Sequence, residues 1–128
     1  MTGSCHCGAV TIALTDKPEY LFDCNCSNCS KHGVLWGYFL PAQVSVIGET
    51  SRYTHPGRDK PSSIVHFCGT CGCTTHWSPN VHIAQDMMGA NMRLFASEEL
   101  AGIPLHFPDG KGWSGQGPFG MRRESGVY

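Results

Sequence analysis

The chain has 128 residues, of which 41% are hydrophobic and only 15% charged, and its formal net charge is −1. This length fits one small domain spanning 1–128, and the near-zero charge excludes a surface that binds nucleic acid or an anionic membrane mainly by electrostatic attraction. The N-terminus lacks the basic start and apolar run of a signal peptide, and no stretch approaches the roughly 18–20 apolar residues that span a bilayer. A cytoplasmic protein is therefore predicted.

Short strands are predicted along most of the chain, because apolar and β-branched segments alternate with glycine and proline turns. In chain order these strands cover residues 10–14, 20–24, 34–40, 43–47, 51–54, 62–67, 74–77, 81–83 and 90–94. One helical turn is expected over 28–33, and a short helix over 97–100 with Ser97 as its cap. The glycine-rich tail, 111–128, is predicted to be irregular. Many short strands with little helix predict an all-β fold.

The eight cysteines form three tight groups: Cys5-x-Cys7, Cys24-x-Cys26-x-x-Cys29 and Cys68-x-x-Cys71-x-Cys73. Disulfides stabilise most when they close long loops between separated partners, and this clustering does not suit them. Closely spaced thiols are instead typical of metal ligands, and zinc is the metal that such thiolate groups usually hold. The sequence therefore predicts zinc binding.

The first predicted zinc site joins a C-x-C pair to a C-x-x-C pair, giving the four ligands of a closed structural site. Its ligands are Cys5, Cys7, Cys68 and Cys71. Cys5 and Cys7 are expected on one face of a strand, since alternate side chains of a strand share a face. Gly72 is expected to adopt positive φ in the turn after Cys71.

The second predicted site uses Cys24, Cys26 and Cys29, with Cys73 as a possible fourth ligand. Three protein ligands with an open position are typical of catalytic zinc, whereas four thiolates are typical of structural zinc. Both alternatives remain open on spacing alone. The functional interpretation therefore depends on the position of Cys73.

Three segments resemble the family of glutathione-dependent formaldehyde-activating enzymes and the related domain of centromere protein V. They are Gly3-Ser-Cys-His-Cys-Gly-Ala9, Cys24-Asn-Cys-Ser-Asn-Cys29 followed by Gly33, and His66-Phe-Cys-Gly-Thr-Cys-Gly72. The resemblance implies a β-tent fold of antiparallel sheets with a structural zinc at the first site and a catalytic zinc at the second. It also implies carbon–sulfur lyase chemistry, the reversible condensation of formaldehyde with glutathione. Cys73 stands where relatives often have a small hydroxyl residue.

The hypothesis that follows is an enzyme that acts on adducts of glutathione, or a similar thiol, with an aldehyde. His32, three residues after Cys29, is the predicted proton carrier, and His66 and His76 are further candidates. Three arginines are candidates for holding a glutathione carboxylate: Arg52, Arg58 and Arg93. The large aromatic residues are expected mainly in the core: Trp36, Tyr38, Phe39, Phe67 and Trp77. The alternative is a non-catalytic, zinc-stapled binding module in which both zinc ions are structural.

Overall fold

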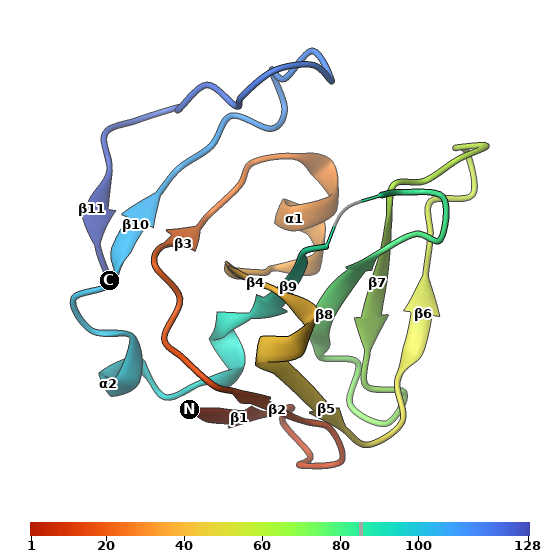
Figure 1. Ribbon diagram of the computed structural model, residues 1–128, viewed down its shortest axis with the longest axis vertical. Coiled ribbons are helices and arrows are strands. Elements are labelled where there is room, and N and C mark those ends of the chain that lie inside the picture. The colour runs from red at the N-terminus through yellow and green to blue at the C-terminus, as the bar shows by residue number, and fades with distance from the viewer. Residues whose placement is uncertain (85) are drawn as a thin grey trace.

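The computed structural model describes residues 1–84 and 86–128, and it consists mainly of short strands (Figure 1). The strands are β1 (Thr2–Ser4), β2 (Thr11–Leu14), β3 (Leu21–Phe22), β4 (Trp36–Phe39), β5 (Val44–Ile47), β6 (Ser51–Tyr53), β7 (Ser63–Phe67), β8 (Thr74–Pro79), β9 (Met88–Asn91), β10 (Pro104–His106) and β11 (Gly126–Val127). The helical segments are α1 (Ser27–His32), α2 (Ser97–Leu100) and the 3-10 turns η1 (Pro41–Gln43) and η2 (Met92–Leu94). The predicted all-β fold is confirmed.

The described strands form two sheets. The smaller has the order β1-β2-β5, and the larger has the order β11-β10-β3-β4-β9-β8-β7-β6. Neighbouring strands are antiparallel, as predicted, except that β10 pairs with β3 in parallel. Because these two strands are far apart in the sequence, no tight hairpin forces them to run antiparallel. The β-tent description itself stays a prediction from the resemblance.

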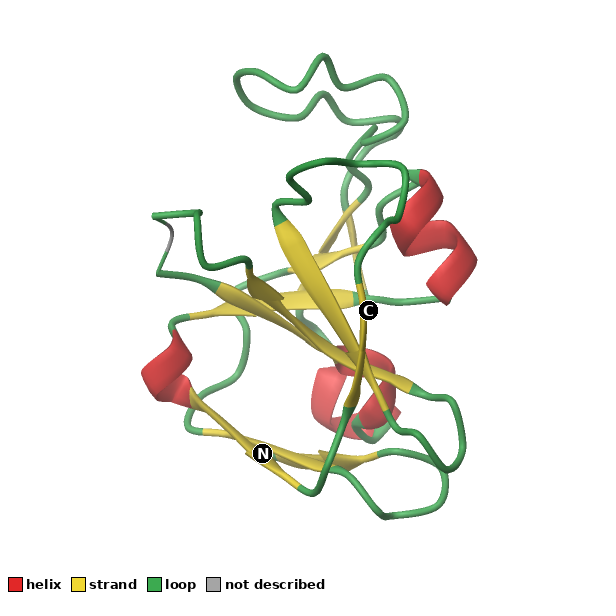
Figure 2. Cartoon of the chain, turned by 90° about the vertical axis from the view of Figure 1, so that its right-hand side faces the viewer, coloured by secondary structure: helices red, strands yellow, loops and turns green. Residues whose placement is uncertain are grey.

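The main core lies between the two sheets, which cross one above the other in Figure 2. The smaller sheet contributes Ile12 and Leu14, and the larger sheet contributes Leu21, Phe39 and Ala90 among others. Side chains alternate along a strand, so the residues of β4 next to Phe39 and Gly37 point away from this core. The larger sheet therefore has a second face on which a site can form.

Several local predictions are wrong. Residues 81–83 form a turn rather than a strand, because Asn80 bonds the backbone N–H groups of Val81 and Ile83. The strand predicted over 90–94 ends at Asn91, whose side chain accepts from the N–H of Arg93 and begins η2. Ser97 lies inside α2, and the N-cap position is Ala96, which offers no side-chain acceptor.

The tail after residue 110 is more ordered than predicted, because several contacts fix it to the body of the protein. Strand β11 pairs with β10. Arg122 forms an ion pair with Asp23 at 2.7 Å, and the Arg123 guanidinium lies 3.5 Å from the centre of the Phe107 ring. Among the helices that the structure describes, none combines the length and apolar character needed to cross a membrane.

Candidate metal centres and an aromatic pocket

The first cysteine group is a compact cluster of four thiols. The sulfur atoms of Cys5, Cys7, Cys68 and Cys71 all lie within 4.8 Å of one another. Cys5 and Cys68 are almost fully buried, with 2% and 1% of their surface exposed. Four converging thiols are the donor set of a closed, tetrahedral metal site.

Two tight turns hold these four thiols. In one, the N–H of Gly8 donates to the carbonyl of Cys5 at 3.0 Å, and in the other the N–H of Gly72 donates to the carbonyl of Cys68 at 2.8 Å. Gly8 has φ 79° and Gly72 has φ 77°, a left-handed conformation that favours glycine. The prediction for Gly72 is confirmed. The strand predicted through Cys5 and Cys7 is wrong, because β1 ends at Ser4 and a turn brings the two thiols together.

The second group, Cys24, Cys26 and Cys29, also has its sulfur atoms within 4.8 Å of one another. Cys24 and Cys26 lie in the segment after β3, and Cys29 lies in the first turn of α1. Cys26 is the N-cap of α1, and its sulfur accepts from the N–H of Cys29 at 3.4 Å. The helix predicted at this position is confirmed, with its end at Gly33 in the left-handed conformation (φ 61°). The cap thus fixes two cysteines relative to each other.

Hydrogen bonds shift the pKa values of the thiols in this cluster in opposite directions. The thiols of Cys24 and Cys29, with the backbone N–H groups of Cys29 and Asn28, stabilise a thiolate at Cys26 and lower its pKa to about 2. The same contacts to Cys24 and Cys26, together with burial, raise the pKa of Cys29. These contacts favour the thiolate form of Cys26, which is the form that binds a metal ion.

Cys73 lies beside the first cluster and is not grouped with Cys24, Cys26 and Cys29. It packs against the buried set of Cys5, Val10 and Cys68, and its carbonyl accepts from the N–H of Cys68 at 2.9 Å. The structure therefore does not bring this possible fourth ligand to the second site. The reason is that the backbone bond from Cys68 to Cys73 closes one turn that holds Cys68, Cys71 and Cys73 together.

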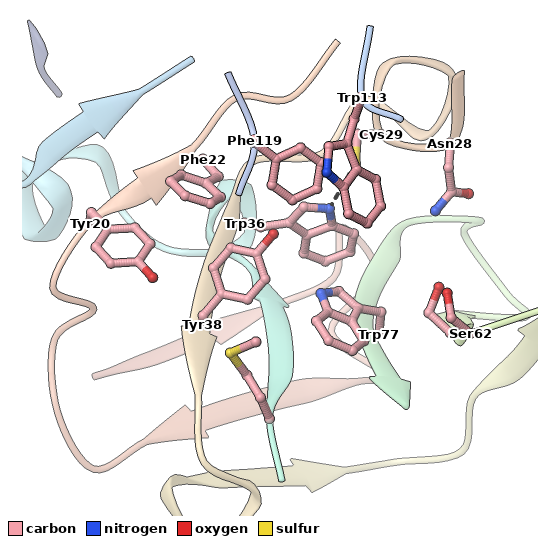
Figure 3. A pocket seen from close by; sticks show the side chains of 12 residues that line it. Tyr20, Phe22, Asn28, Cys29, Trp36, Tyr38, Ser62, Trp77, Trp113 and Phe119 are labelled. Atoms are coloured by element: carbon pink, nitrogen blue, oxygen red, sulfur yellow. Dashed lines mark hydrogen bonds between the residues drawn. The ribbon is translucent and has the colours of Figure 1, made fainter. Parts of the chain in front are cut away.

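A pocket of about 360 Å³ opens beside the second cluster and reaches Cys29 (Figure 3). Aromatic rings form most of its wall: Tyr20, Phe22, Trp36, Tyr38, Trp77, Trp113 and Phe119. The remaining lining residues are Asn28, Cys29, Ser62, Ser63 and Met87. The Trp36 indole Nε1 donates to the Cys29 sulfur at 3.2 Å, which connects the aromatic wall to the cluster.

Strand alternation explains this wall. Trp36 and Tyr38 are two residues apart on β4, so both point away from the core that holds Phe39. Trp77 of β8 lies over Gly89 of β9, where a Cβ atom would be 2.0 Å from the indole nitrogen. The expectation that these aromatic residues belong to the core is wrong for Tyr38 and Trp77, which line the pocket while only partly buried.

His32, the predicted proton carrier, lies at the end of α1. Its Nδ1 contacts the carbonyl oxygen of Asn28 at 2.7 Å, and its ring packs against Tyr53 with centroids 5.5 Å apart. It is not among the described residues that line the pocket. Its role as proton carrier stays a prediction, and the pocket itself offers the hydroxyl groups of Tyr20 and Tyr38.

His66 and His76 form a stacked pair on β7 and β8, with ring centroids 4.0 Å apart and planes at 8°. Both are buried, and hydroxyl groups bond them: Ser78 at 2.9 Å from Nε2 of His66, and Thr75 at 3.0 Å from Nδ1 of His76. Burial, and then the neighbouring His66, lower the pKa of His76 to about 3. The pair lies outside the described lining of the pocket.

This pair is expected to make stability depend on pH. The folded chain favours neutral His76, whose pKa is lowered from 6.5 to about 3. The free energy of unfolding is therefore highest above pH 6.5, and it falls as the pH drops from 6.5 towards 3 because the unfolded chain takes up the proton more readily. Between pH 7.5 and 5.5 one such histidine removes about 1 kcal/mol from the free energy of unfolding. Urea unfolding at both pH values should show this loss reduced in His76→Phe and unchanged in His82→Gln, since His82 lies in an exposed turn. An identical pH dependence in His76→Phe would contradict the assignment.

The three candidate arginines are also outside the described pocket lining. Arg52 lies on β6 opposite His66, Arg58 in an exposed turn and Arg93 in η2, and all three are exposed. The structure therefore does not bring them to Cys29. A glutathione-holding role for any of them stays a prediction.

Comparison with known proteins identifies the family. A sequence model described as glutathione-dependent formaldehyde-activating enzyme matches residues 1–102. The chain belongs to this family. The resemblance predicted from the cysteine motifs is thereby confirmed, and the match includes all eight cysteines. A crystal structure of a Rhodobacter sphaeroides protein is similar, with a TM-score of 0.63 and 26% identity over 82% of this chain and 99% of that one.

The family match ends at residue 102, before the tail whose residues Trp113 and Phe119 line the pocket. A turn over 109–112 attaches this tail to the second cluster: Asn25 donates to Asp109 at 2.7 Å and accepts from the N–H of Lys111 at 2.9 Å. Gly110 lies against the cysteines, where a Cβ atom would be 2.5 Å from the Cys24 sulfur and 2.9 Å from the Cys26 Cβ. The cysteine motifs give no indication of this contact, because Gly110 lies 81 positions after Cys29.

Gly110→Ala is expected to weaken metal binding at the second cluster by about 10- to 100-fold, because the added methyl group displaces Cys24 or Cys26. Titration with Co²⁺, followed by its thiolate charge-transfer absorption, measures binding at each cluster. Gly120→Ala is the matched control, since nothing lies within 4 Å of its added Cβ. Equal Co²⁺ affinity in Gly110→Ala and the unmodified chain would show that the contact does not constrain the cluster.

Proposed function

We propose that the chain is a zinc-dependent carbon–sulfur lyase that catalyses the reversible addition of a thiol such as glutathione to an aldehyde. The observation that carries this proposal is the double position of Cys29, which belongs to the three-thiol cluster and also lines the pocket. Three thiols leave one position of a tetrahedral ion free, and the pocket offers space for a substrate beside it. Membership of a family named for glutathione-dependent formaldehyde activation supports both partners.

Both clusters fit zinc, because thiolates are soft ligands and zinc accepts them in tetrahedral geometry. We assign the four thiols of the first cluster, two of them buried, to a structural ion, and Cys24, Cys26 and Cys29 to the catalytic one. Free thiols in both groups suit a reducing compartment, which supports a cytoplasmic location.

The reaction forms one carbon–sulfur bond. The thiol loses its proton, its sulfur attacks the carbonyl carbon, and the carbonyl π electrons pass to the oxygen, which takes up a proton to give the thiohemiacetal. Zinc at this site would favour the thiolate form of the substrate or polarise the carbonyl oxygen. The chain contributes Trp36, whose N–H fixes the Cys29 sulfur, and Tyr38 in the pocket wall.

Tyr38 is suited to donate a hydrogen bond to the carbonyl oxygen. Burial is the main cause that raises the pKa of its hydroxyl well above the ordinary value, and the neighbouring cysteines of the second cluster add to the shift. The phenol therefore keeps its proton at neutral pH, where it can donate but does not compete as a nucleophile. Its contribution would grow as negative charge develops on the oxygen.

The alternative of a non-catalytic module with two structural zinc ions would be favoured by a complete set of four ligands at the second site. Cys73 was the residue proposed to supply the fourth, and it lies with the first cluster instead. This position supports the enzyme over the module.

Exchange NMR tests the proposal, because thiols and formaldehyde condense without a catalyst and only the rate reports catalysis. Glutathione is mixed at equilibrium with ¹³C-labelled formaldehyde, or with larger aldehydes, and the exchange rate between free and adduct carbon is measured. We expect the rate to rise in proportion to zinc-loaded protein and to return to the uncatalysed value after chelation. An uncatalysed rate with every aldehyde would contradict the proposed function.

A further inference from the structure

The pocket is much larger than formaldehyde, which has only two heavy atoms. Its volume is about 360 Å³, and its wall is mainly aromatic (Figure 3). Pockets of this size and character usually enclose most of an apolar ligand and use a few polar groups to orient it. Here a few polar groups lie within the aromatic wall, among them Asn28, Cys29 and the hydroxyl groups of Tyr20 and Tyr38. A carbonyl group attached to a large apolar body matches that distribution.

The charges of glutathione do not match this wall. Among the lining residues that the structure describes, none is a lysine, arginine, aspartate or glutamate. Glutathione carries two carboxylates and an ammonium group, and charged groups are costly to bury without a partner. The candidate arginines Arg52, Arg58 and Arg93 lie elsewhere, and Arg122 is paired with Asp23. The pocket therefore suits the uncharged reactant rather than the tripeptide.

The tail contributes two aromatic rings whose surfaces are partly exposed and available to contact a ligand. Trp113 and Phe119 face each other with centroids 4.6 Å apart, yet 41% and 38% of their surfaces are exposed. The Trp113 indole donates to the carbonyl of Gly117 at 3.0 Å, so its ring is held in place rather than free to rotate away. An aromatic ligand gains stacking or edge contacts with rings that are already fixed.

These two rings are also a feature of this chain beyond the family match, which ends at residue 102. The tail that carries them is fixed near the second cluster by the Asn25–Asp109 bond and by the Arg122–Asp23 ion pair. Asn25, which lies between Cys24 and Cys26, therefore helps to set the distance of these two rings from the metal ligands. This arrangement connects substrate selection to the cluster.

We propose that the aldehyde taken by this pocket is an uncharged aromatic aldehyde, with its ring among the aromatic side chains and its carbonyl carbon at the Cys29 end. The assignment rests on the proposed function, because it names the aldehyde of that same reaction. The chemistry is unchanged: the thiol sulfur bonds to the carbonyl carbon, and the thiol proton balances the new hydroxyl group. Trp113 and Phe119 determine specificity for the ring.

Binding of unreactive probes to zinc-loaded protein tests this proposal separately from catalysis. Calorimetry compares 2-naphthylmethanol with 2-naphthoate, which has the same ring and a negative charge. We expect saturable binding of the alcohol at one site and binding of the carboxylate at least about tenfold weaker. Trp113→Ala and Phe119→Ala should each weaken binding of the alcohol by about tenfold. Met121→Ala is the control, since this exposed residue of the same tail does not line the pocket.

Three results would overturn the proposal: no binding of 2-naphthylmethanol, competition by glutathione for the same Trp113-dependent site, or tighter binding of tetramethylammonium than of the alcohol. The last would indicate a cage for cations, which aromatic rings also form.

The exchange assay with 2-naphthaldehyde separates the pocket assignment from the proposed enzymatic function. Ring binding without accelerated exchange of any aldehyde would uphold the pocket assignment and contradict the enzyme, whereas exchange of formaldehyde without ring binding would do the reverse.

Discussion

Cys29→Ser is expected to remove the metal from the second cluster and to lower the thiol–aldehyde exchange rate by more than about 100-fold. Serine is a poor ligand for zinc at neutral pH, so only two thiols of this cluster remain. The substitution also removes the sulfur that accepts from Trp36 Nε1 in the pocket wall. Metal content per chain and exchange NMR should change together, from two ions to one and from catalysed to uncatalysed exchange.

Cys73→Ser is the matched control for this change. It replaces the same atom type in a half-buried cysteine, but Cys73 lies beside the first cluster and outside the three-thiol group. We expect two metal ions per chain and an unchanged exchange rate in this variant. Full exchange activity in a folded Cys29→Ser protein that holds only its first metal ion would contradict the catalytic role of the second cluster.

The cysteine clusters could be predicted because their geometry is largely local. Cys24-x-Cys26-x-x-Cys29 places three thiols across one helix cap, and Cys68-x-x-Cys71-Gly72 forms a turn whose glycine has positive φ. Because thiolates are soft ligands, they also favour zinc over hard metal ions such as magnesium or calcium. Cys73 could not be placed in this way, because its spacing from Cys71 matches the spacing of Cys24 from Cys26. Which cluster it joins depends on how the turn after Cys68 packs against Cys5 and Val10, a contact between distant parts of the chain.

The aromatic pocket depends on contacts that no local pattern contains. Tyr20 and Phe22, like Trp36 and Tyr38, are two residues apart, and that alternation could have indicated an aromatic face. Which face is buried depends on the smaller sheet, which covers the opposite side of β4. Trp113 and Phe119 reach the site through bonds such as Arg122 to Asp23, across 99 positions of sequence. Composition predicts a glycine-rich tail to be irregular and gives no information about such contacts.

Cys68→Ser should have the largest effect on stability of any change considered. Cys68 is 1% exposed, its sulfur lies 3.7 Å from that of Cys7, and it joins the chain's middle to its N-terminal turn. A structural metal contributes its binding free energy directly to folding, and that contribution is of the same order as the roughly 5–15 kcal/mol stability of a small domain. We therefore expect the variant to lose the first metal ion and to be largely unfolded at 37 °C.

Circular dichroism, thermal unfolding and metal analysis measure this effect, and Cys73→Ser again serves as the control. Cys73 packs against the same buried set, so a packing defect alone would affect both variants. We expect Cys73→Ser to keep both metal ions and to unfold within a few degrees of the unmodified protein, because it removes no ligand. A Cys68→Ser protein that unfolds at the same temperature as the Cys73→Ser protein would show that the first cluster does not hold a structural metal. The contrast with Cys29→Ser completes the argument: loss of the first ion should unfold the chain, whereas loss of the second should leave it folded and inactive.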